Sequence, residues 1–174
     1  MTDVTPGSAE KRWFVYYTKS RHEKKVLDLL ERRGYEVFLP IHAVVRQWSD
    51  RKKKVEVPLF NSYIFVFSYE HEIPTVLTTP GISWSVRYNG KPAVLRQNEM
   101  ELIQRFVSTG LFVETELIPS QFDPGDKVVV RDGPLKGVTG ILEKTVAEAR
   151  FIVAIESIQQ VIKVQLPGYL LEKI

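Results

Sequence analysis

The sequence contains no cysteine and only three histidines. The absence of cysteine excludes disulfide bonds, thiolate metal sites and cysteine nucleophiles, and it fits a reducing compartment. His22, His42 and His71 lie far apart in the chain without metal-ligand spacing, so we expect no metal or other cofactor, although folding could still gather them. The chain also lacks a Gly-x-Ser-x-Gly elbow, a dinucleotide-binding glycine pattern and a complete phosphate loop. These absences favour a protein that is not an enzyme.

Long hydrophobic runs are missing as well. No apolar run approaches the roughly 20 residues that a membrane-spanning helix requires, and the first ten residues have no apolar signal core. We therefore expect a cytoplasmic protein that does not enter a membrane. We also expect it to be a monomer. Residues 1–10 are small and polar, which predicts a flexible leader.

Positive charge is concentrated in the first part of the chain. Residues 11–113 hold 17 Lys and Arg against 10 Asp and Glu, a balance of +7, whereas residues 114–174 hold 7 against 9, a balance of −2. The basic part favours a polyanionic partner such as nucleic acid, and solubility explains scattered lysines equally well.

Residues 11–113 mix strand-like and helix-like patterns. Aromatic and β-branched runs predict strands at 13–18, 35–39, 43–48, 54–57, 61–67 and 84–88. A capping box of Ser20 and Glu23 predicts a helix that ends at Gly34, and further helices are expected at 72–78 and 98–110. This alternation predicts an α+β sandwich with an antiparallel sheet.

Residues 114–122 have little periodicity and are expected to form a linker. After it, short β-rich runs at 128–130, 138–142, 151–155, 161–164 and 169–171 predict a small five-stranded β-barrel over residues 123–174. Closing such a small sheet would remove its edges.

Three segments carry a family resemblance. W-F-V-Y-Y-T-K-S-R-H-E-K-K-V resembles the first strand and helix of the N-terminal domain of NusG-type transcription factors, the NGN domain. R-Q-W-S-D-R-K-K-K-V-E-V-P-L-F-N-S-Y-I-F-V resembles the basic hairpin and following strand of that domain. P-G-D-K-V-V-V-R-D-G-P-L-K-G-V-T-G-I-L resembles the KOW motif that opens the family's C-terminal barrel. The resemblance covers nearly the whole chain after residue 10, and it implies an NGN-type domain at 11–113, a linker at 114–122 and a KOW domain at 123–174.

Two departures from the housekeeping pattern stand out. Asn61 and Ser62 replace the usual Pro-Gly, and Leu135 replaces the aromatic residue that commonly follows Gly-Pro in the KOW loop. These departures resemble specialised paralogues of the RfaH and UpxY kind, which promote read-through of particular operons such as those for polysaccharide biosynthesis.

The resemblance implies that the first domain binds the clamp helices of RNA polymerase. Tyr17, Tyr63 and Phe65 match the family's aromatic depression, while Glu72 and Thr75 match a segment that touches the polymerase's other pincer. Core packing is the alternative for each aromatic side chain. On this basis, replacing Tyr63 and Phe65 with alanine should abolish polymerase binding and leave the fold intact.

Two basic clusters are candidates for nucleic-acid binding. The first consists of Lys19, Arg21, His22, Lys24 and Lys25, which the resemblance places near the non-template DNA strand. The second consists of Arg51, Lys52, Lys53 and Lys54, with Trp48 beside it, a combination that suits nucleic acid. The alternatives are a solvated helix face for the first cluster and a solubilising loop for the second.

In the C-terminal domain, Leu135 and Lys136 match the loop that binds a ribosomal protein or a termination factor in relatives. The alternative is a solvent-facing loop tip. The sequence as a whole predicts a transcription elongation or antitermination factor that suppresses pausing or termination. The rival interpretation is a KOW-containing RNA-binding or ribosome-associated protein without polymerase contact.

Overall fold

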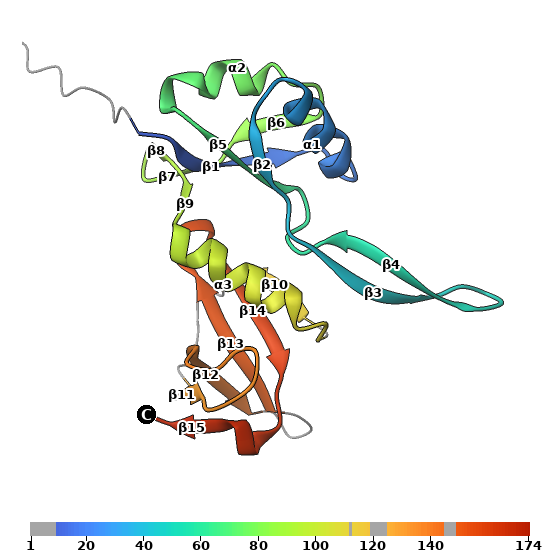
Figure 1. Ribbon diagram of the computed structural model, residues 1–174, viewed down its shortest axis with the longest axis vertical. Helices are drawn as coiled ribbons and strands as arrows, with labels where there is room; N and C mark the ends of the chain where they lie inside the picture. Colours follow the sequence, from blue (N-terminus) through green and yellow to red (C-terminus); the bar gives the residue numbers. More distant parts are fainter. Residues whose placement is uncertain (1–9, 112, 119–124, 145–148) are drawn as a thin grey trace, which may run out of the picture. The chain divides into compact units, whose positions relative to one another are not determined.

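The computed structural model describes residues 10–111, 113–118, 125–144 and 149–174, and the chain divides into two compact units (Figure 1). Unit 1 comprises residues 1–39 and 60–97, and unit 2 comprises residues 40–59 and 98–174. This division differs from the continuous segments 11–113 and 123–174 that we expected. Residues 40–59 and the helix after residue 97 are grouped with the C-terminal part of the chain.

Unit 1 is built on a five-stranded antiparallel sheet. The strand order is β2-β5-β1-β6, and β9 also pairs with β1. Its elements are β1 (Arg12–Thr18), α1 (Glu23–Arg32), β2 (Glu36–Phe38), β5 (Tyr63–Ser68), the 3₁₀ turn η1 (Glu70–Glu72), α2 (Ile73–Leu77), β6 (Ile82–Ser85), β7 (Arg87–Tyr88), β8 (Lys91–Pro92) and β9 (Val94–Leu95).

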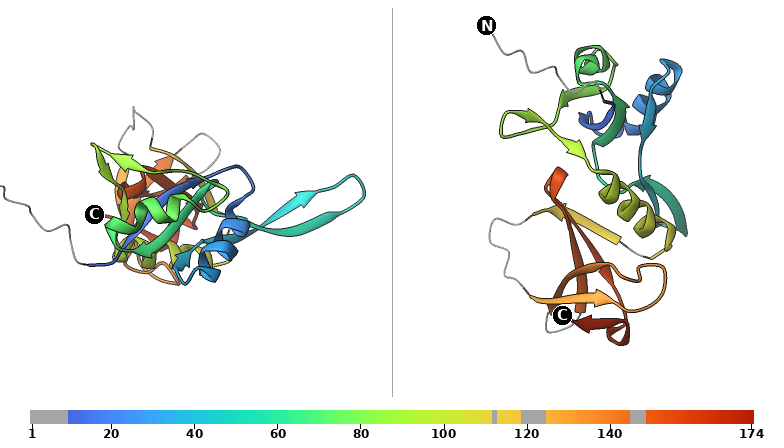
Figure 2. Two further views of the ribbon diagram at one scale, coloured as in Figure 1. Left: turned by 90° about the horizontal axis from the view of Figure 1, so that it is seen from above. Right: turned by 60° about the vertical axis from the view of Figure 1, so that its left-hand side comes forward.

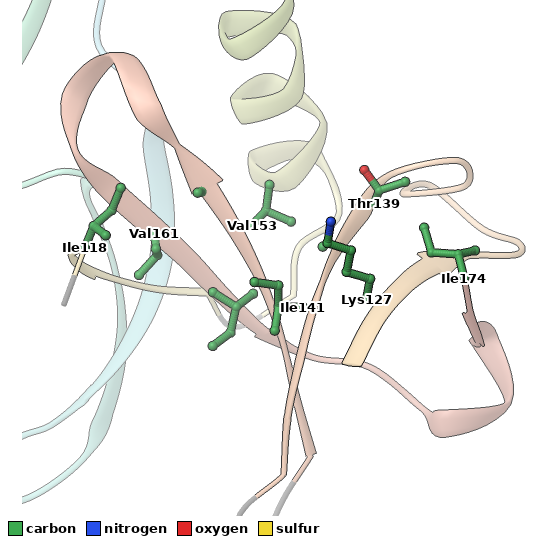
Figure 3. A pocket seen from close by; sticks show the side chains of 10 residues that line it. Ile118, Lys127, Thr139, Ile141, Val153, Val161 and Ile174 are labelled. Carbon is green, nitrogen blue, oxygen red and sulfur yellow. The ribbon is translucent and has the colours of Figure 1, made fainter. Parts of the chain in front are cut away.

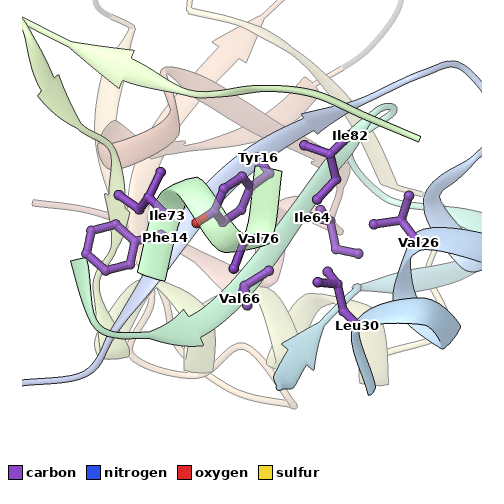
Figure 4. Packing of buried hydrophobic residues seen from close by; sticks show 9 residues of the cluster. All are labelled: Phe14, Tyr16, Val26, Leu30, Ile64, Val66, Ile73, Val76 and Ile82. Carbon is purple, nitrogen blue, oxygen red and sulfur yellow. The ribbon is translucent and has the colours of Figure 1, made fainter. Parts of the chain in front are cut away.

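One face of this sheet carries the main core of unit 1. Side chains alternate along a strand, so Phe14 and Tyr16 of β1 share a face with Ile64 of β5, and all three are fully buried. Val26 of α1 and Val76 of α2 pack against this face (Figure 4). Burial also raises the pKa of Tyr16. Complete burial of each apolar side chain contributes about 1.5–3 kcal/mol, so this face holds the two helices on the sheet.

The start of α1 differs from the expected capping box. The helix begins at Glu23, and its N-cap residue is His22, which makes no capping hydrogen bond with its side chain. Arg21 has φ 62°, a left-handed conformation that turns the chain into the helix. Glu23 is 6% exposed, and its carboxylate accepts a hydrogen bond from the backbone N–H of Ser62 at 2.9 Å. Glu23 therefore joins α1 to the segment before β5 instead of capping the helix.

Unit 2 contains a six-stranded antiparallel sheet in the order β10-β14-β13-β12-β11-β15 and a separate two-stranded ribbon, β3-β4. Its elements are β3 (Ile41–Gln47), β4 (Lys52–Pro58), α3 (Gln97–Ser108, whose first residue belongs to unit 1), β10 (Val113–Leu117), β11 (Asp126–Val130), β12 (Thr139–Lys144), β13 (Ala149–Ile155), η2 (Glu156–Ile158), β14 (Gln160–Gln165), η3 (Gly168–Leu170) and β15 (Leu171–Lys173).

The additional strand comes from the segment expected to be a linker. β10 pairs with β14 from Val113↔Val164 to Leu117↔Gln160, so the sheet has one strand more than the five expected. β10 is polar at three consecutive residues, Glu114, Thr115 and Glu116. Pairing with β14 supplies hydrogen bonds for the backbone N–H and C=O groups of the strand. Residues 119–122 of the expected linker lie outside the described residues.

The α+β class with antiparallel sheets is confirmed. No helix among the described residues is long and apolar enough to cross a membrane.

Candidate partner and nucleic-acid interfaces

Three aromatic rings from neighbouring strands meet on the second face of the unit 1 sheet. β1 lies between β5 and β6, and Tyr17 is paired with Tyr63 on one side and with Trp84 on the other. The Tyr17 and Trp84 rings are stacked with centroids 4.4 Å apart, and the Tyr17 and Tyr63 rings meet edge to face at 5.6 Å. Tyr17 and Tyr63 are half-buried, whereas Trp84 is 54% exposed.

Tyr88 of β7 adjoins this group. A hydrogen bond links its side chain to that of Tyr63, and burial together with Tyr63 raises the pKa of Tyr88 to about 12. Tyr88 is therefore neutral at physiological pH. We call Tyr17, Tyr63, Trp84 and Tyr88 the aromatic patch. Stacked and edge-to-face rings hold one another in place, so the patch offers apolar area with little rotamer freedom left to lose on binding.

Phe65 does not belong to the patch, contrary to the sequence-based expectation. It shares a sheet face with Tyr63, yet it is fully buried. Its ring lies 5.8 Å from that of Phe38 and 6.5 Å from that of Phe60. Strand alternation correctly placed Phe65 on this face, but Phe65 is covered there, whereas Tyr63 is only half-buried.

Trp84, in contrast, was missed as a site residue. The sequence indicated a strand ending at the Asn89-Gly90 turn, but it did not reveal which strand this segment pairs with. Only the pairing of β6 with β1 brings Trp84 beside Tyr17.

Glu72 and Thr75 are not brought together with the aromatic patch. Glu72 accepts a hydrogen bond from the backbone N–H of Tyr69 at 2.9 Å, so its carboxylate organises the turn before α2. Thr75 is exposed on α2. Because Val76 of α2 packs on the core face with Tyr16, these two residues belong to the opposite side of the sheet from Tyr17. The structure therefore separates the two sets of residues expected to contact polymerase.

The first basic cluster is brought together at the junction of β1 and α1. It occupies the loop after β1 and the first turn of the helix, where Lys19, Arg21, Lys24 and Lys25 are exposed and His22 is half-buried. The backbone N–H of Lys19 donates to the carbonyl of Gly81 at 2.8 Å, and His22 Nδ1 lies 2.9 Å from the carbonyl oxygen of Ser20. These contacts fix the loop backbone while the cationic side chains face solvent.

The second basic cluster is at the free end of the β3-β4 ribbon. Arg51 lies in the turn and Lys52, Lys53 and Lys54 begin β4, all of them exposed. Trp48, at the other side of the turn, is 57% exposed. The cationic side chains and the Trp48 ring are therefore both accessible to a nucleic acid.

Leu135 is buried. It is therefore neither the solvent-facing loop tip of the alternative interpretation nor a residue that a partner protein can reach. Its exposed fraction is 2%, although Lys136 beside it is exposed. Arg105 of α3 donates hydrogen bonds to the carbonyl oxygens of Pro134 and Lys136, at distances down to 2.7 Å for Lys136. The helix is thus hydrogen-bonded on both sides of Leu135. In this structure only Lys136 of the expected pair is available to a partner.

Unit 2 also contains an apolar hollow of about 510 Å³ (Figure 3). Strands β11 to β14 contribute to its walls, which include Ile141, Ile152 and Val161. Among the residues that line it, only Lys127 and Thr139 have polar side chains. The hollow therefore lacks an acid and base pair for catalysis. Within the described ranges, no group of three or more His, Asp or Glu could hold a metal ion.

A family model described as "Transcription termination factor nusG" matches residues 11–104, which is more than half of the chain. This stretch includes the aromatic patch and both basic clusters.

The chain belongs to the NusG family.

Curated NusG-family relatives match most of the chain. The "Transcription termination/antitermination protein NusG" of Pseudomonas aeruginosa is 29% identical over 146 residues, covering 77% of this chain and 81% of that protein. The protein of the same name from Neisseria meningitidis serogroup B is 29% identical over 150 residues, with the same coverage.

The fold is shared with a solved NusG structure. The structure described as "Domain interaction in Thermotoga maritima NusG" matches with a TM-score of 0.61 and 23% identity, and the match covers 97% of this chain and 99% of that one. Membership of the NusG family gives the chain a general role in transcription, as a transcription factor.

Proposed function

We propose that this chain binds RNA polymerase through the aromatic patch and suppresses pausing or termination during elongation. The observation that carries the proposal is the stack of Tyr17 on Trp84, at 4.4 Å, with Trp84 more than half exposed at the edge of a rigid sheet. Exposed aromatic residues that become buried when a partner docks contribute much of the binding energy at protein interfaces. The clamp helices of polymerase, a helical coiled coil, are the proposed partner.

The proposed mechanism needs no catalysis. A ligand shifts a conformational equilibrium by the difference between its affinities for the two states. Tighter binding to the elongating polymerase by about 1.4 kcal/mol lowers the ratio of paused to elongating complexes tenfold. Residues 11–113 act as the polymerase-binding domain in this proposal, and the protein acts as a cytoplasmic monomer.

The basic cluster at the start of α1 extends this contact to the non-template DNA strand. Its backbone is fixed by the hydrogen bond from Lys19 to Gly81, and exposed cations on such a loop suit phosphate contacts. The second cluster, at Arg51 to Lys54, is a further nucleic-acid contact.

The C-terminal sheet is proposed to recruit a second protein, a ribosomal protein or a termination factor, through the loop that contains Lys136. Particular operons, such as those for polysaccharide biosynthesis, are the proposed targets. Support for a specialised role comes from the departures at Asn61, Ser62 and Leu135. The alternative function, RNA or ribosome binding without polymerase contact, is favoured only by the two basic clusters.

Polymerase capture tests the proposal. The full chain, immobilised, should retain core RNA polymerase, and Trp84→Ala should reduce that binding at least tenfold with an unchanged circular dichroism spectrum. Tyr169→Ala is the matched control, because Tyr169 is 80% exposed in unit 2, outside the patch. Retention of polymerase by Trp84→Ala at the control level would overturn the patch as the binding site. Co-purification of ribosomal RNA in place of polymerase would establish the alternative.

A further inference from the structure

The two faces of the β3-β4 ribbon can be assigned from its register. Residues directly opposite each other in an antiparallel pair project to the same face. Arg46 lies opposite Lys53, whereas Lys52 lies opposite Gln47 and Lys54 lies opposite Val45. Arg46 and Lys53 therefore occupy one face, and Lys52 and Lys54 occupy the other, so each face of the ribbon carries two cations next to the turn.

This distribution of charge is unfavourable for the ribbon alone. Like charges placed directly opposite each other in a sheet destabilise it, and Arg46 and Lys53 form such a pair. None of the four cations makes a salt bridge with a carboxylate in the part of the chain that the structure describes. Asp50 is the single acid between residues 46 and 54. A polyanion that reaches both faces would remove the repulsion.

The base of the ribbon is anchored, in contrast to its tip. The backbone N–H of Leu59 donates to the carbonyl of Pro40 at 2.8 Å, and the Thr115 hydroxyl donates to the carbonyl of Leu59 at 2.9 Å. Val44 and Val55, which face each other near the base, are half-buried. Towards the turn every residue is exposed, and the N–H of Trp48 donates to the carbonyl of Arg51 at 2.7 Å, which closes the loop. Figures 1 and 2 show β3 and β4 side by side as a ribbon that the turn closes at one end.

We infer that the tip of the β3-β4 ribbon enters the major groove of double-helical DNA, with each of its two faces turned towards one phosphate backbone. A sheet with its side chains is about 10 Å thick, which fits a major groove roughly 12 Å wide but not a minor groove of roughly 6 Å. The inference rests on the proposed function in one respect, since that function already places nucleic acid at this cluster. It adds the identity of the nucleic acid and the mode of contact.

Other nucleic acids fit the ribbon less well. A single strand has one phosphate backbone and is bound along one groove with stacked aromatic rings, so it would leave the cations of one face unused. The major groove of double-helical RNA is too deep and narrow for side chains to read. Duplex DNA is the ligand that offers a phosphate backbone to each face.

Fluorescence anisotropy with the full chain tests the inference. The probes are a labelled 25-base-pair DNA duplex, one of its strands alone and an RNA duplex of the same sequence. We expect the DNA duplex to bind at least tenfold more tightly than the single strand or the RNA duplex. Affinity is measured over a range of salt concentrations, because each phosphate contact adds roughly −0.9 to the slope of log affinity against log salt.

Two double substitutions test the two faces of the ribbon separately. Arg46→Ala with Lys53→Ala removes the cations of one face, and Lys52→Ala with Lys54→Ala removes those of the other. Each pair should reduce the salt slope for duplex DNA by roughly 2. Arg32→Ala with Lys91→Ala is the matched control, because it removes the same net charge from exposed positions outside the ribbon and should leave the slope unchanged.

The inference would be overturned if only one face changed the slope, or if the control changed it equally. Binding of the single strand or of the RNA duplex as tightly as the DNA duplex would also overturn it. The result is independent of polymerase docking: both ribbon variants should retain polymerase, while Trp84→Ala should retain duplex binding. Loss of polymerase capture by the unsubstituted chain, with duplex binding intact, would remove the proposed function and leave this inference standing.

Discussion

The backbone N–H of Ser62 donates a hydrogen bond to the carboxylate of Glu23 at 2.9 Å, and Ser62 itself has φ 65°. The bond joins the first turn of α1 to the segment that enters β5, the strand that carries Tyr63. The sequence resemblance puts Ser62 in the place of a glycine, and the left-handed conformation of Ser62 is one that glycine adopts readily.

Replacement of Ser62 by glycine should stabilise unit 1. Glycine adopts a positive φ without the strain that a side chain adds, and this gain exceeds its larger loss of entropy on folding, for a net effect of about 0.5–1 kcal/mol. Urea unfolding measures the change. Ser83→Gly, within β6, is the control and should destabilise by a similar amount because serine is not strained there. Equal effects of the two substitutions would contradict the role assigned to φ at Ser62.

Loss of the Glu23 carboxylate should destabilise unit 1. Glu23→Ala leaves the N–H of Ser62 buried without its acceptor, at a cost of about 1–3 kcal/mol. Glu23→Gln keeps an acceptor oxygen and should cost less. Thermal unfolding of both variants measures the difference, and equal costs would show that the hydrogen bond is not what makes Glu23 important.

Phe65 and Trp84 should respond in opposite ways to alanine substitution. Phe65 is fully buried, so Phe65→Ala should cost about 3–5 kcal/mol of stability, whereas its effect on polymerase binding per folded molecule should be small. Trp84→Ala should cost little stability but about 2 kcal/mol or more of binding. Denaturant unfolding and polymerase titration give the two values for each variant. The double substitution of Tyr63 and Phe65 is therefore unsuitable as a test of binding, because it would damage the fold.

His42 should make the stability of unit 2 depend on pH. Burial lowers the pKa of this histidine, and its buried Nδ1 has no hydrogen-bond partner among the described residues. Because the unfolded chain binds the proton more readily, stability is fully present above about pH 6.5 and is lost as the pH falls below it. His42→Val should reduce that loss. Unfolding at pH 7.5 and 5.5 measures it, and His71→Gln, at an exposed position, is the control. A pH dependence unchanged in His42→Val would assign it to another group.

The sequence by itself determined the α+β class, the family and the positions of most strands and helices. These follow from local patterns: the aromatic run before α1, the charged turn between β3 and β4, and the glycine-rich segment after β11. The alternation of Tyr63 and Phe65 with Ile64 also showed that both faces of β5 are apolar.

Only the tertiary structure decided which of these side chains remain exposed. Phe65 lies on the same face as Tyr63 but is enclosed by Phe38 and Phe60, whereas Trp84 reaches the patch because β6 pairs with β1. Leu135 is buried although it lies in a turn. Alternation along a strand sets the direction of a side chain, but whether that direction meets solvent depends on which distant segment packs there.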